Sequence, residues 1–374
     1  MAQPELRVCH IVTGDGWGGA ERVVSLLLEG MLRYGDLKIH VVLFSQGQLA
    51  TTLDELGIET HVIQEEGRSF LSLCRALRSW LSDKRFDVIH VHRYNELAAA
   101  IVASVPRSPN LVLTVHGLSP WSQLELLEGI KYWAPLLIAR FFGAYFVAVS
   151  KEIEERLCKV LGRTRTTRIG NPIPPVPKIG EGQNLRTMLG WSATQRLVGF
   201  VGRLEFVKGP DLFLRIASMC SKEIGFVIIG GGAMEVELVA SVQDADLKSC
   251  VRFLGQVRDA TPYLLQLDVL ALTSRHEGLP MVVLEAASCG VPVVAFDVGG
   301  VREVVDGGAA ARLIPFGDFP GFVHALQNVL SNDTAVRNGL SLWAASVRSK
   351  FSLQAVVKAY LIVYRAAARL SEFK

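Results

Sequence analysis

Short apolar runs alternate along the chain with longer amphipathic stretches, and they form two series. The first series has apolar runs at residues 8–13, 38–44, 88–92, 111–116 and 145–149. The second has them at residues 197–201, 225–229, 251–254, 269–272, 292–296 and 311–314. Continuous apolar strands between helices are typical of a parallel sheet that is covered on both faces. The pattern therefore predicts an α/β fold with doubly wound sheets.

A segment rich in proline and glycine separates the two series. Residues 169–183 read IGNPIPPVPKIGEGQ, and because proline fixes φ and removes a backbone donor, this segment is expected to be a connector. A chain of 374 residues fits two domains of about 100–200 residues each. We therefore expect Rossmann-like domains at residues 1–172 and 173–352. Open α/β sheets bind ligands at the carboxyl ends of their strands, so two facing domains predict an interdomain cleft.

Composition and charge exclude some classes of protein, disordered chains above all. Half of the residues are hydrophobic, which excludes a disordered chain, and 39 Lys and Arg against 36 Asp and Glu give no sign of nucleic-acid binding. The six cysteines form no CxxC pair and are expected to be reduced thiols. The sequence shows no signal peptide and no apolar run of about 18 residues. A cytoplasmic protein is therefore expected.

The most informative segment is residues 274–290, SRHEGLPMVVLEAASCG. It predicts a helix over residues 280–289 that begins at the carboxyl end of a strand and stops at Gly290. The free N–H groups of such a helix favour oxygen-rich or anionic ligands. Glu277 precedes the helix and Glu285 lies inside it, so the two carboxylates can hold separate hydroxyl groups of one ligand. The alternative is a loop charge and a solvated helix face.

Two cations follow the strand at 197–201. Residues 198–212 contain Arg203 and Lys208 in a loop bounded by glycines, where two cations can neutralise a diphosphate without a metal. The alternative is a pair of exposed surface charges. Gly299 and Gly300 follow the strand at 292–296 and offer backbone amides that a phosphate can approach closely.

The first predicted strand leads into a glycine-rich turn. Residues 14–21 read GDGWGGAE and match the G-x-G-x-x-G fingerprint of dinucleotide-binding proteins. The next strand ends in Ser45 and Gln46, so it supplies no carboxylate for a ribose diol, which argues against an NAD(P)-dependent oxidoreductase. Trp17 in this turn either stacks on a ring of a bound ligand or plugs the surface of the domain.

Histidines and aspartates offer two possible metal sites, and we expect neither. His90 and His92 alternate on one predicted strand and point the same way, with His116 on the next strand. They are expected to be polar residues that line the predicted cleft, since no cysteine or carboxylate at ligand spacing supports a three-histidine site. Asp244 and Asp246 form a D-x-D before a strand, which is expected to be a solvated turn.

Four motifs together resemble glycosyltransferase family 4. They are GGAE after the first strand, VAVSK at residues 147–151, GRLxxxKG, and Glu-x7-Glu in EGLPMVVLEAASCGVPVVA. The resemblance covers nearly the whole chain and implies a GT-B fold and retaining transfer from a nucleotide sugar, with a UDP-sugar favoured over GDP-mannose. It also implies a saccharide or lipid-linked saccharide acceptor in cell-envelope polysaccharide, capsule, O-antigen or exopolysaccharide biosynthesis. No cofactor, metal or nucleic acid is implied. A non-catalytic nucleotide- or sugar-binding relative is the remaining alternative.

The resemblance also implies roles for single residues. Arg203 and Lys208 match the pair that binds the donor diphosphate, and Glu285 matches the carboxylate that holds the ribose. The implied catalytic residues are His116, Arg203, Lys208 and Glu277. The implied donor-binding residues are Gly18, Gly19, Arg203, Lys208, Val257, Arg258, Glu277, Gly278, Leu279, Pro280, Met281, Glu285, Gly299 and Gly300. The implied acceptor-side residues are Trp17, His92 and His116.

The resemblance has consequences for the hinge, the last helix and the membrane. Residues 171–173 are NPI where many relatives carry an NG-type turn, which is expected to alter the hinge. The last helix, expected at residues 354–370, should pack with the rest of the C-terminal segment, 353–374, back onto the first domain. Residues 70–85 and 131–146 are amphipathic or aromatic and could rest on an anionic membrane, peripheral at its inner face. The alternative is ordinary helices that cover the first sheet.

Overall fold

The computed structural model describes residues 5–14, 16–104, 110–117, 126–176, 184–244, 247–331 and 334–369, without the side chains of 126–132, 244 and 369. The chain divides into two compact units. Unit 1 comprises Met1–Pro172 and Leu353–Lys374, and unit 2 comprises Ile173–Ser352. Each unit is built on one parallel sheet.

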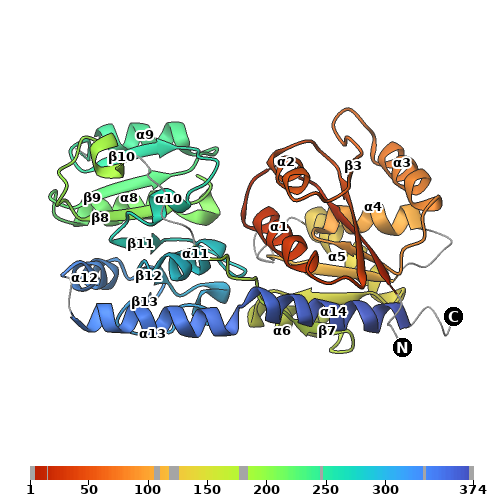
Figure 1. Ribbon diagram of the computed structural model, residues 1–374. Helices are drawn as coiled ribbons and strands as arrows, with labels where there is room; N and C mark the ends of the chain where they lie inside the picture. The colour runs from red at the N-terminus through yellow and green to blue at the C-terminus, as the bar shows by residue number, and fades with distance from the viewer. Residues whose placement is uncertain are drawn as a thin grey trace. The chain divides into compact units, whose positions relative to one another are not determined.

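The sheet of unit 1 has seven parallel strands in the order β3-β2-β1-β4-β5-β6-β7. Its two edge strands, β3 and β7, are labelled in Figure 1. The strands are β1 Leu6–Val12, β2 Leu37–Leu43, β3 Thr60–Val62, β4 Val88–Val91, β5 Leu111–Val115, β6 Tyr145–Ala148 and β7 Thr166–Arg168. The apolar runs predicted five of them. The edge strands β3 and β7 were not predicted, because each has three residues and none of these is fully buried.

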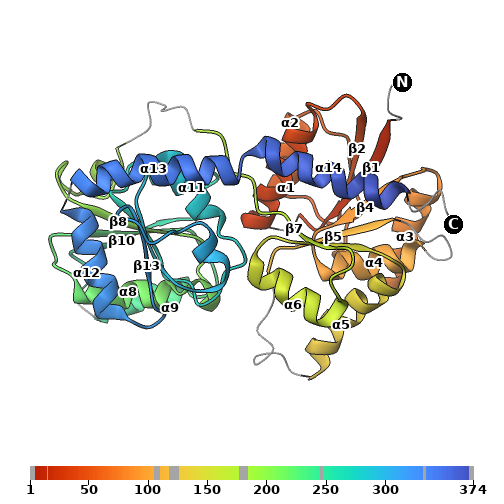
Figure 2. The ribbon, with the colours of Figure 1, turned by 90° about the horizontal axis from the view of Figure 1, so that it is seen from below.

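Helices cover both faces of this sheet. They are α1 Gly19–Met31, α2 Gln48–Glu55, α3 Phe70–Ser82, α4 Tyr94–Ser104, α5 Leu126–Phe141, α6 Lys151–Leu161 and α14 Leu353–Arg369. The last helix, α14, lies against α1 and the sheet (Figure 2). Its Tyr360 and Tyr364 are 2% and 0% exposed and pack with Val8, Val88 and Val112 of the strands. A segment that begins 205 positions after the end of β6 thus completes the core of unit 1.

The sheet of unit 2 has six parallel strands in the order β10-β9-β8-β11-β12-β13. The strands are β8 Leu197–Val201, β9 Gly225–Ile229, β10 Val251–Gly255, β11 Val269–Leu272, β12 Val293–Phe296 and β13 Ala311–Ile314. The helices are α7 Leu185–Met188, η2 Phe206–Lys208, α8 Pro210–Met219, α9 Glu235–Asp244, α10 Thr261–Leu264, α11 Met281–Cys289, η3 Gly299–Glu303, α12 Phe319–Leu330 and α13 Thr334–Lys350. All six apolar runs of the second series are strands.

Both sheets are doubly wound, which confirms the predicted fold class. The order of the strands reverses between β1 and β4 in unit 1 and between β8 and β11 in unit 2. In open α/β sheets, ligands bind beyond the carboxyl ends of the strands at such a reversal. The loops that follow these four strands are therefore the places in which to look for a site.

Candidate functional site

A lysine and a glutamate meet at the reversal of the unit 2 sheet. Lys208 ends η2, after β8, and Glu277 lies in the loop after β11. The Nζ atom of Lys208 is 2.8 Å from both carboxylate oxygens of Glu277, and Ser274 Oγ donates to Oε1 at 2.6 Å. Glu277 is 7% exposed, and the side chain of Lys208 is 28% exposed. A charge pair buried to this extent holds a fixed geometry and leaves one side of the lysine accessible.

The two loops that carry this pair are tied together by further contacts. Arg275 donates to Asp211 through two nitrogens, at 2.8 and 2.6 Å, and to the carbonyl oxygen of Phe206 at 2.7 Å. Burial opposes the charge of Asp211, but the hydrogen bonds and charge of Arg275 hold its pKa below the usual value. Thr273 Oγ1 donates to the carbonyl oxygen of Gly209 at 2.8 Å. These bonds make one rigid wall of the ends of β8 and β11.

A third loop, after β12, closes on the backbone of Glu277. The N–H of Gly300 donates to the carbonyl oxygen of Glu277 at 3.2 Å. Gly299 has φ of +55°, and a Cβ at this position would lie 1.9 Å from the same oxygen. Glycine is therefore required at residue 299 on two grounds, its backbone conformation and the close approach of the Glu277 loop.

Helix α11 begins next to this wall. Its first residue is Met281, one residue later than the sequence predicted, because Pro280 is the N-cap. It ends at Gly290, which has the left-handed conformation expected of a C-cap glycine, with φ of +68°. Glu285 lies inside the helix and is 6% exposed, so it is not a solvated surface charge. Residues 278–280 connect Glu277 to the N-terminus of the helix, where free N–H groups favour an anion.

Three other predicted residues of unit 2 lie nearer to its surface. Arg203 follows β8 and pairs with Glu205 at 2.6 Å, and its side chain is 57% exposed. Val257 and Arg258 follow β10, which is two strands away from β8 in the sheet. Two strand spacings are about 10 Å, a separation that a nucleoside can bridge.

In unit 1 the glycine-rich turn caps helix α1. The N–H of Gly18 donates to Oε2 of Glu21 at 3.0 Å, and Gly19 is the first helical residue. Glu21 is 3% exposed and pairs with Arg93, which follows β4. The side chain of Trp17 is partly buried and packs against the core cluster of β1, α1, β2 and α2.

A buried glutamate that the sequence analysis missed joins the ends of β1 and β4. Glu96 is fully buried and accepts hydrogen bonds from the N–H and Oγ1 of Thr13, at 2.6 and 2.8 Å. It also accepts from the N–H groups of His92 and Arg93, at 2.8 and 2.9 Å. Burial raises the pKa of Glu96 to about 7, and the hydrogen bonds oppose this shift. Glu96 looks like an ordinary helix residue in the sequence, because its role depends on β1 lying beside β4.

The histidines form a different group from the one considered in the sequence. His10, on β1, joins His90 and His92, and the ligand atoms of these three lie within 4.8 Å of one another. His92 is 3% exposed and lies behind His116, with its Nδ1 3.3 Å from Nε2 of His116. His10 does not stand out in the sequence, because its pairing with His90 follows from the strand order.

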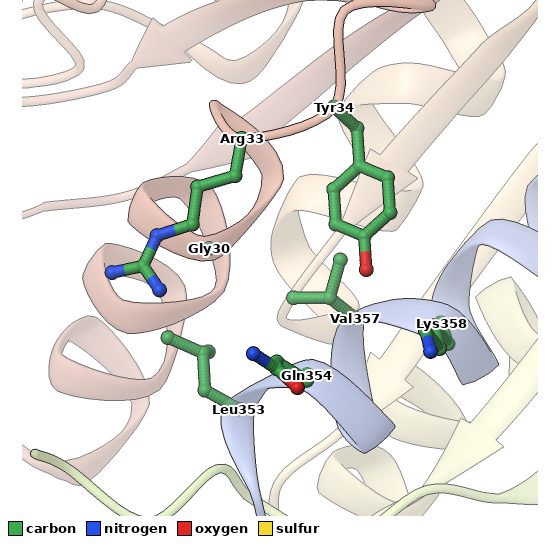
Figure 3. Close-up of a pocket in the computed structure, with 7 residues that line it drawn as sticks. All are labelled: Gly30, Arg33, Tyr34, Leu353, Gln354, Val357 and Lys358. Carbon is green, nitrogen blue, oxygen red and sulfur yellow. The ribbon is translucent and has the colours of Figure 1, made fainter.

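A pocket of about 310 Å³ lies elsewhere in unit 1 (Figure 3). Its walls come from the end of α1 and the start of α14, with Arg33 and Lys358 at its rim. The glycine-rich turn is at the other end of α1, roughly 18 Å away along a 13-residue helix. The pocket therefore lies at the end of α1 opposite to the glycine-rich turn.

Some sequence predictions concern residues outside the described ones, among them residues 177–183 of the connector and residues 370–374 of the C-terminal segment. Asp246 lies outside them, and Asp244 ends α9, with its side chain not described. The side chains of Lys131 and Tyr132 also lie outside, so the segment 131–146 is assessed from Trp133 onward. Within the described parts of the chain, no helix combines the length and apolarity that crossing a membrane requires.

Known proteins resemble the chain in both units. Residues 17–176 match the family model described as Glycosyltransferase Family 4, and residues 195–332 match the one described as Glycosyl transferases group 1. A D-inositol 3-phosphate glycosyltransferase of Corynebacterium jeikeium is 33% identical over 302 residues, which are 76% of this chain and 68% of the relative.

Two further relatives cover nearly all of the chain. The UDP-Gal:alpha-D-GlcNAc-diphosphoundecaprenol alpha-1,3-galactosyltransferase of Escherichia coli is 26% identical over 356 residues, 90% of each protein. The crystal structure of Anabaena HepE in complex with UDP and glucose superposes with a TM-score of 0.84 at 21% identity. The match covers 95% of this chain and 98% of HepE.

Proposed function

The chain belongs to glycosyltransferase family 4 and is a glycosyltransferase with the GT-B fold, and from this premise we propose how it acts. It transfers a sugar from a nucleotide sugar, with retention of the anomeric configuration, to a saccharide or lipid-linked saccharide. A UDP-sugar is the favoured donor and GDP-mannose the second choice. The proposed transfer is a step in the biosynthesis of a cell-envelope polysaccharide, capsule, O-antigen or exopolysaccharide.

The pair of Lys208 and Glu277 is the observation that carries this proposal. A cation and a carboxylate 2.8 Å apart stand beside the N-terminus of α11 and the backbone of Gly299 and Gly300. This arrangement offers positive charge and N–H donors to a diphosphate, and carboxylate oxygens to sugar hydroxyls. When the diphosphate binds Lys208, it takes over part of the lysine's hydrogen bonding, and Glu277 is released to hold the transferred sugar.

The reaction follows from where charge develops. The bond between the sugar C1 and the phosphate oxygen breaks, and Lys208, Arg203 and the N-terminal end of α11 stabilise the charge on the departing diphosphate. The acceptor hydroxyl attacks C1 on the same face, and its proton passes to the departing phosphate oxygen. The protein's part is to hold the donor and stabilise charge, so a separate protein base is not needed. Because cations of the chain neutralise the diphosphate, we propose that the transfer is metal-independent.

The remaining predicted residues have positions that suit a nucleotide sugar. In this proposal Glu285, inside α11, holds the ribose hydroxyls, and the backbone of Val257 and Arg258 holds the base. The UDP in the HepE complex and the UDP-Gal in the name of the E. coli relative support a uridine nucleotide. For unit 1, the family resemblance gives Gly18 and Gly19 the distal phosphate and gives His116 the transferred sugar, and both roles are part of this proposal.

A transfer assay with a panel of donors tests the proposal. The protein is incubated with UDP-glucose, UDP-galactose, UDP-GlcNAc or GDP-mannose and with simple or undecaprenyl-linked sugar acceptors, in the presence of EDTA. Release of UDP and a product whose anomeric proton shows the donor's configuration by NMR are expected. An inverted product would contradict the retaining mechanism, and activity that disappears with EDTA would contradict metal independence.

We also propose that unit 1 rests on an anionic membrane. Helices α3, α4 and α5 lie side by side (Figure 2), and the end of α5 exposes Leu137, Ile138 and Phe141 by 49%, 46% and 87%. At the start of α3, Phe70 and Leu71 are 48% and 59% exposed. Exposed apolar side chains on amphipathic helices with basic residues nearby are typical of peripheral membrane proteins. A lipid-linked acceptor in the name of the E. coli relative supports this placement at the inner face of the membrane.

A further inference from the structure

A line of hydrogen bonds begins on the C-terminal helix and enters the sheet of unit 1. The hydroxyl of Tyr360 is 2.9 Å from Oγ1 of Thr114, which is 2.8 Å from Nε2 of His90. On the other side of the ring, Nδ1 of His90 is 2.7 Å from the hydroxyl of Tyr364. All four side chains are at most 2% exposed. The line thus runs through the interior of unit 1 and returns to the same helix.

The line continues from Tyr364 to the carboxyl edge of the sheet. The Tyr364 hydroxyl is 3.4 Å from Nε2 of His10, whose Nδ1 is 3.2 Å from Nε2 of His92. Nδ1 of His92 is 3.3 Å from Nε2 of His116, the half-buried histidine that we place beside the transferred sugar. We call this series of seven residues the histidine chain: Tyr360, Thr114, His90, Tyr364, His10, His92 and His116.

The imidazoles of the histidine chain are neutral. Burial lowers the pKa of His10 to about 3 and that of His116 to about 4, where the charge of Arg93 adds to the effect. Burial also holds the pKa values of His90 and His92 well below the usual range. A neutral imidazole has one N–H donor and one lone-pair nitrogen, so each ring donates on one side and accepts on the other. The protons of the histidine chain can therefore all point toward His116 or all point away from it. A change of direction within the chain is possible only at the hydroxyl of Thr114 or Tyr364, which would then accept from both neighbours and leave its own proton without a partner.

The buried end of the histidine chain selects between these arrangements. If the protons point away from His116, Thr114 donates to the hydroxyl oxygen of Tyr360. The proton of the Tyr360 hydroxyl then has no acceptor, because the described residues offer it no partner besides Thr114. If they point toward His116, Tyr360 donates to Thr114 and every following member donates once. Leaving a buried donor without a partner costs free energy. This cost makes the arrangement toward His116 more populated than the other one by roughly 5- to 150-fold. In that arrangement Nδ1–H of His92 donates to Nε2 of His116.

We propose that the C-terminal helix, through the histidine chain, fixes His116 in the tautomer that carries its proton on Nδ1. His116 then offers an N–H donor to an oxygen atom of its ligand, and its lone-pair nitrogen is occupied by His92. The ligand oxygen belongs to the transferred sugar, which rests on the proposed function; the tautomer itself does not. Tyr364 is the positioning residue, because it is the link that connects the helix to His10.

The same bonds argue against a metal held by His10, His90 and His92. Each ring nitrogen of these three histidines already has a partner within the histidine chain. A metal would have to replace several of these bonds and bring two positive charges into a fully buried place.

Two variants of the same helix separate a positioning role from a structural one. Tyr364→Phe cuts the histidine chain between His90 and His10. Nε2 of His10 then lacks a partner for its proton in one direction and for its lone pair in the other, and because both losses cost a similar free energy, neither tautomer of His116 is strongly favoured. Tyr360→Phe removes a buried hydroxyl one helical turn earlier, but the Thr114 hydroxyl can still donate to Nε2 of His90 and keep the direction. Both variants lose one hydroxyl from a buried phenol, so a merely structural effect would be similar in both.

The experiment is ¹⁵N NMR of the full chain with labelled histidine, in which long-range couplings distinguish N–H from bare ring nitrogens. His116→Gln identifies the His116 signals. We expect His116 to carry its proton on Nδ1 in the wild type and in Tyr360→Phe. In Tyr364→Phe we expect both tautomers of His116, with populations within about threefold of each other.

Nε2–H at His116 in the wild type would overturn the proposal, as would an unchanged tautomer in Tyr364→Phe. Saturable uptake of Zn²⁺ that shifts the His10, His90 and His92 signals together would also overturn it. Because the measurement needs no substrate, its result does not depend on whether the proposed function is correct.

Discussion

The ammonium group of Lys208 lies 2.8 Å from both carboxylate oxygens of Glu277, although 69 positions separate the two residues in the sequence. The fold creates this contact by placing β8 beside β11, so that the loops at their carboxyl ends meet. The contact supplies opposite charges at one point of a doubly wound sheet, where ligands of such folds bind. It is the feature from which the proposed donor site is built.

Replacing the carboxylate of this pair should separate binding from transfer. Glu277→Gln keeps a side chain that can accept from Ser274 but removes the charge that faces Lys208. We expect the transfer rate to fall by about 100-fold or more, as for other losses of a polar group at a reacting centre. We expect UDP to bind no more weakly, because Lys208 loses a competing carboxylate. A transfer rate within about threefold of the wild type would contradict the role of Glu277. Glu237→Gln, on the exposed surface of α9, is the matched control.

The loop after β12 provides a test of the architecture. Gly299→Ala adds a Cβ that would lie 1.9 Å from the carbonyl oxygen of Glu277 and must displace that loop. Gly317→Ala is the matched control, because Gly317 also has a positive φ, +87°, but nothing within 4 Å of the added Cβ. Both variants should lose about 1 kcal/mol of stability to backbone strain. Only Gly299→Ala should also lose transfer activity, by about tenfold or more. Equal activity in the two variants would show that the loop position does not matter.

Acid should destabilise unit 1 through its buried histidines. Burial lowers the pKa of His10 to about 3, so between pH 7 and 5 the unfolded chain takes up a proton that the folded chain does not. Stability therefore falls as the pH falls through this window, by about 2 kcal/mol for His10 alone. Glu96, whose pKa is raised to about 7, acts in the opposite direction and offsets part of the combined effect.

Urea unfolding of His10→Gln at pH 7 and pH 5 isolates the contribution of His10. The variant should lose less stability on acidification than the wild type does, by about 2 kcal/mol. His324→Gln, on the exposed face of α12, should keep the wild-type pH dependence. The same pH dependence in all three proteins would mean that His10 is protonated in the folded state.

The membrane placement depends on the exposed end of α5. Leu137→Ser with Phe141→Ser should reduce sedimentation with anionic phosphatidylglycerol vesicles by about tenfold, because two apolar side chains leave the interface. Leu342→Ser, at a leucine of α13 that is 73% exposed, controls for the loss of an exposed apolar residue. A wild-type protein that does not sediment with these vesicles at low salt would contradict the proposal directly.

Much of the fold could be predicted from the sequence, because buried parallel strands give unbroken apolar runs. The strands from Leu197 to Val201 and from Val269 to Leu272 have the predicted bounds. Helix α11 ends as predicted at Gly290, since a glycine after an apolar helix is a strong C-cap signal. The edge strands β3 and β7 were missed, because three half-exposed residues have no periodicity to detect.

The sequence was enough to predict many of the residues of the candidate site, but not the contacts between them. Lys208 and Glu277 each stood out as charges after a strand, but their pairing depends on the strand order. The same holds for His10 and Glu96, whose hydrogen-bond partners come from the loops after β1 and β4 or from α14. A sequence pattern shows which residues end a strand, and the topology decides which of these ends meet.

The most direct test of the central claim is calorimetric binding of UDP, GDP and NAD to the wild type and to Lys208→Met, each with and without EDTA. We expect UDP to bind the wild type with the same affinity in the presence and in the absence of EDTA, and we expect NAD not to bind. We also expect that Lys208→Met weakens UDP binding by about tenfold or more, whereas Lys222→Met, at an exposed lysine of unit 2, does not. Binding of NAD alone, or equal affinity of the wild type and Lys208→Met for UDP, would contradict the proposal.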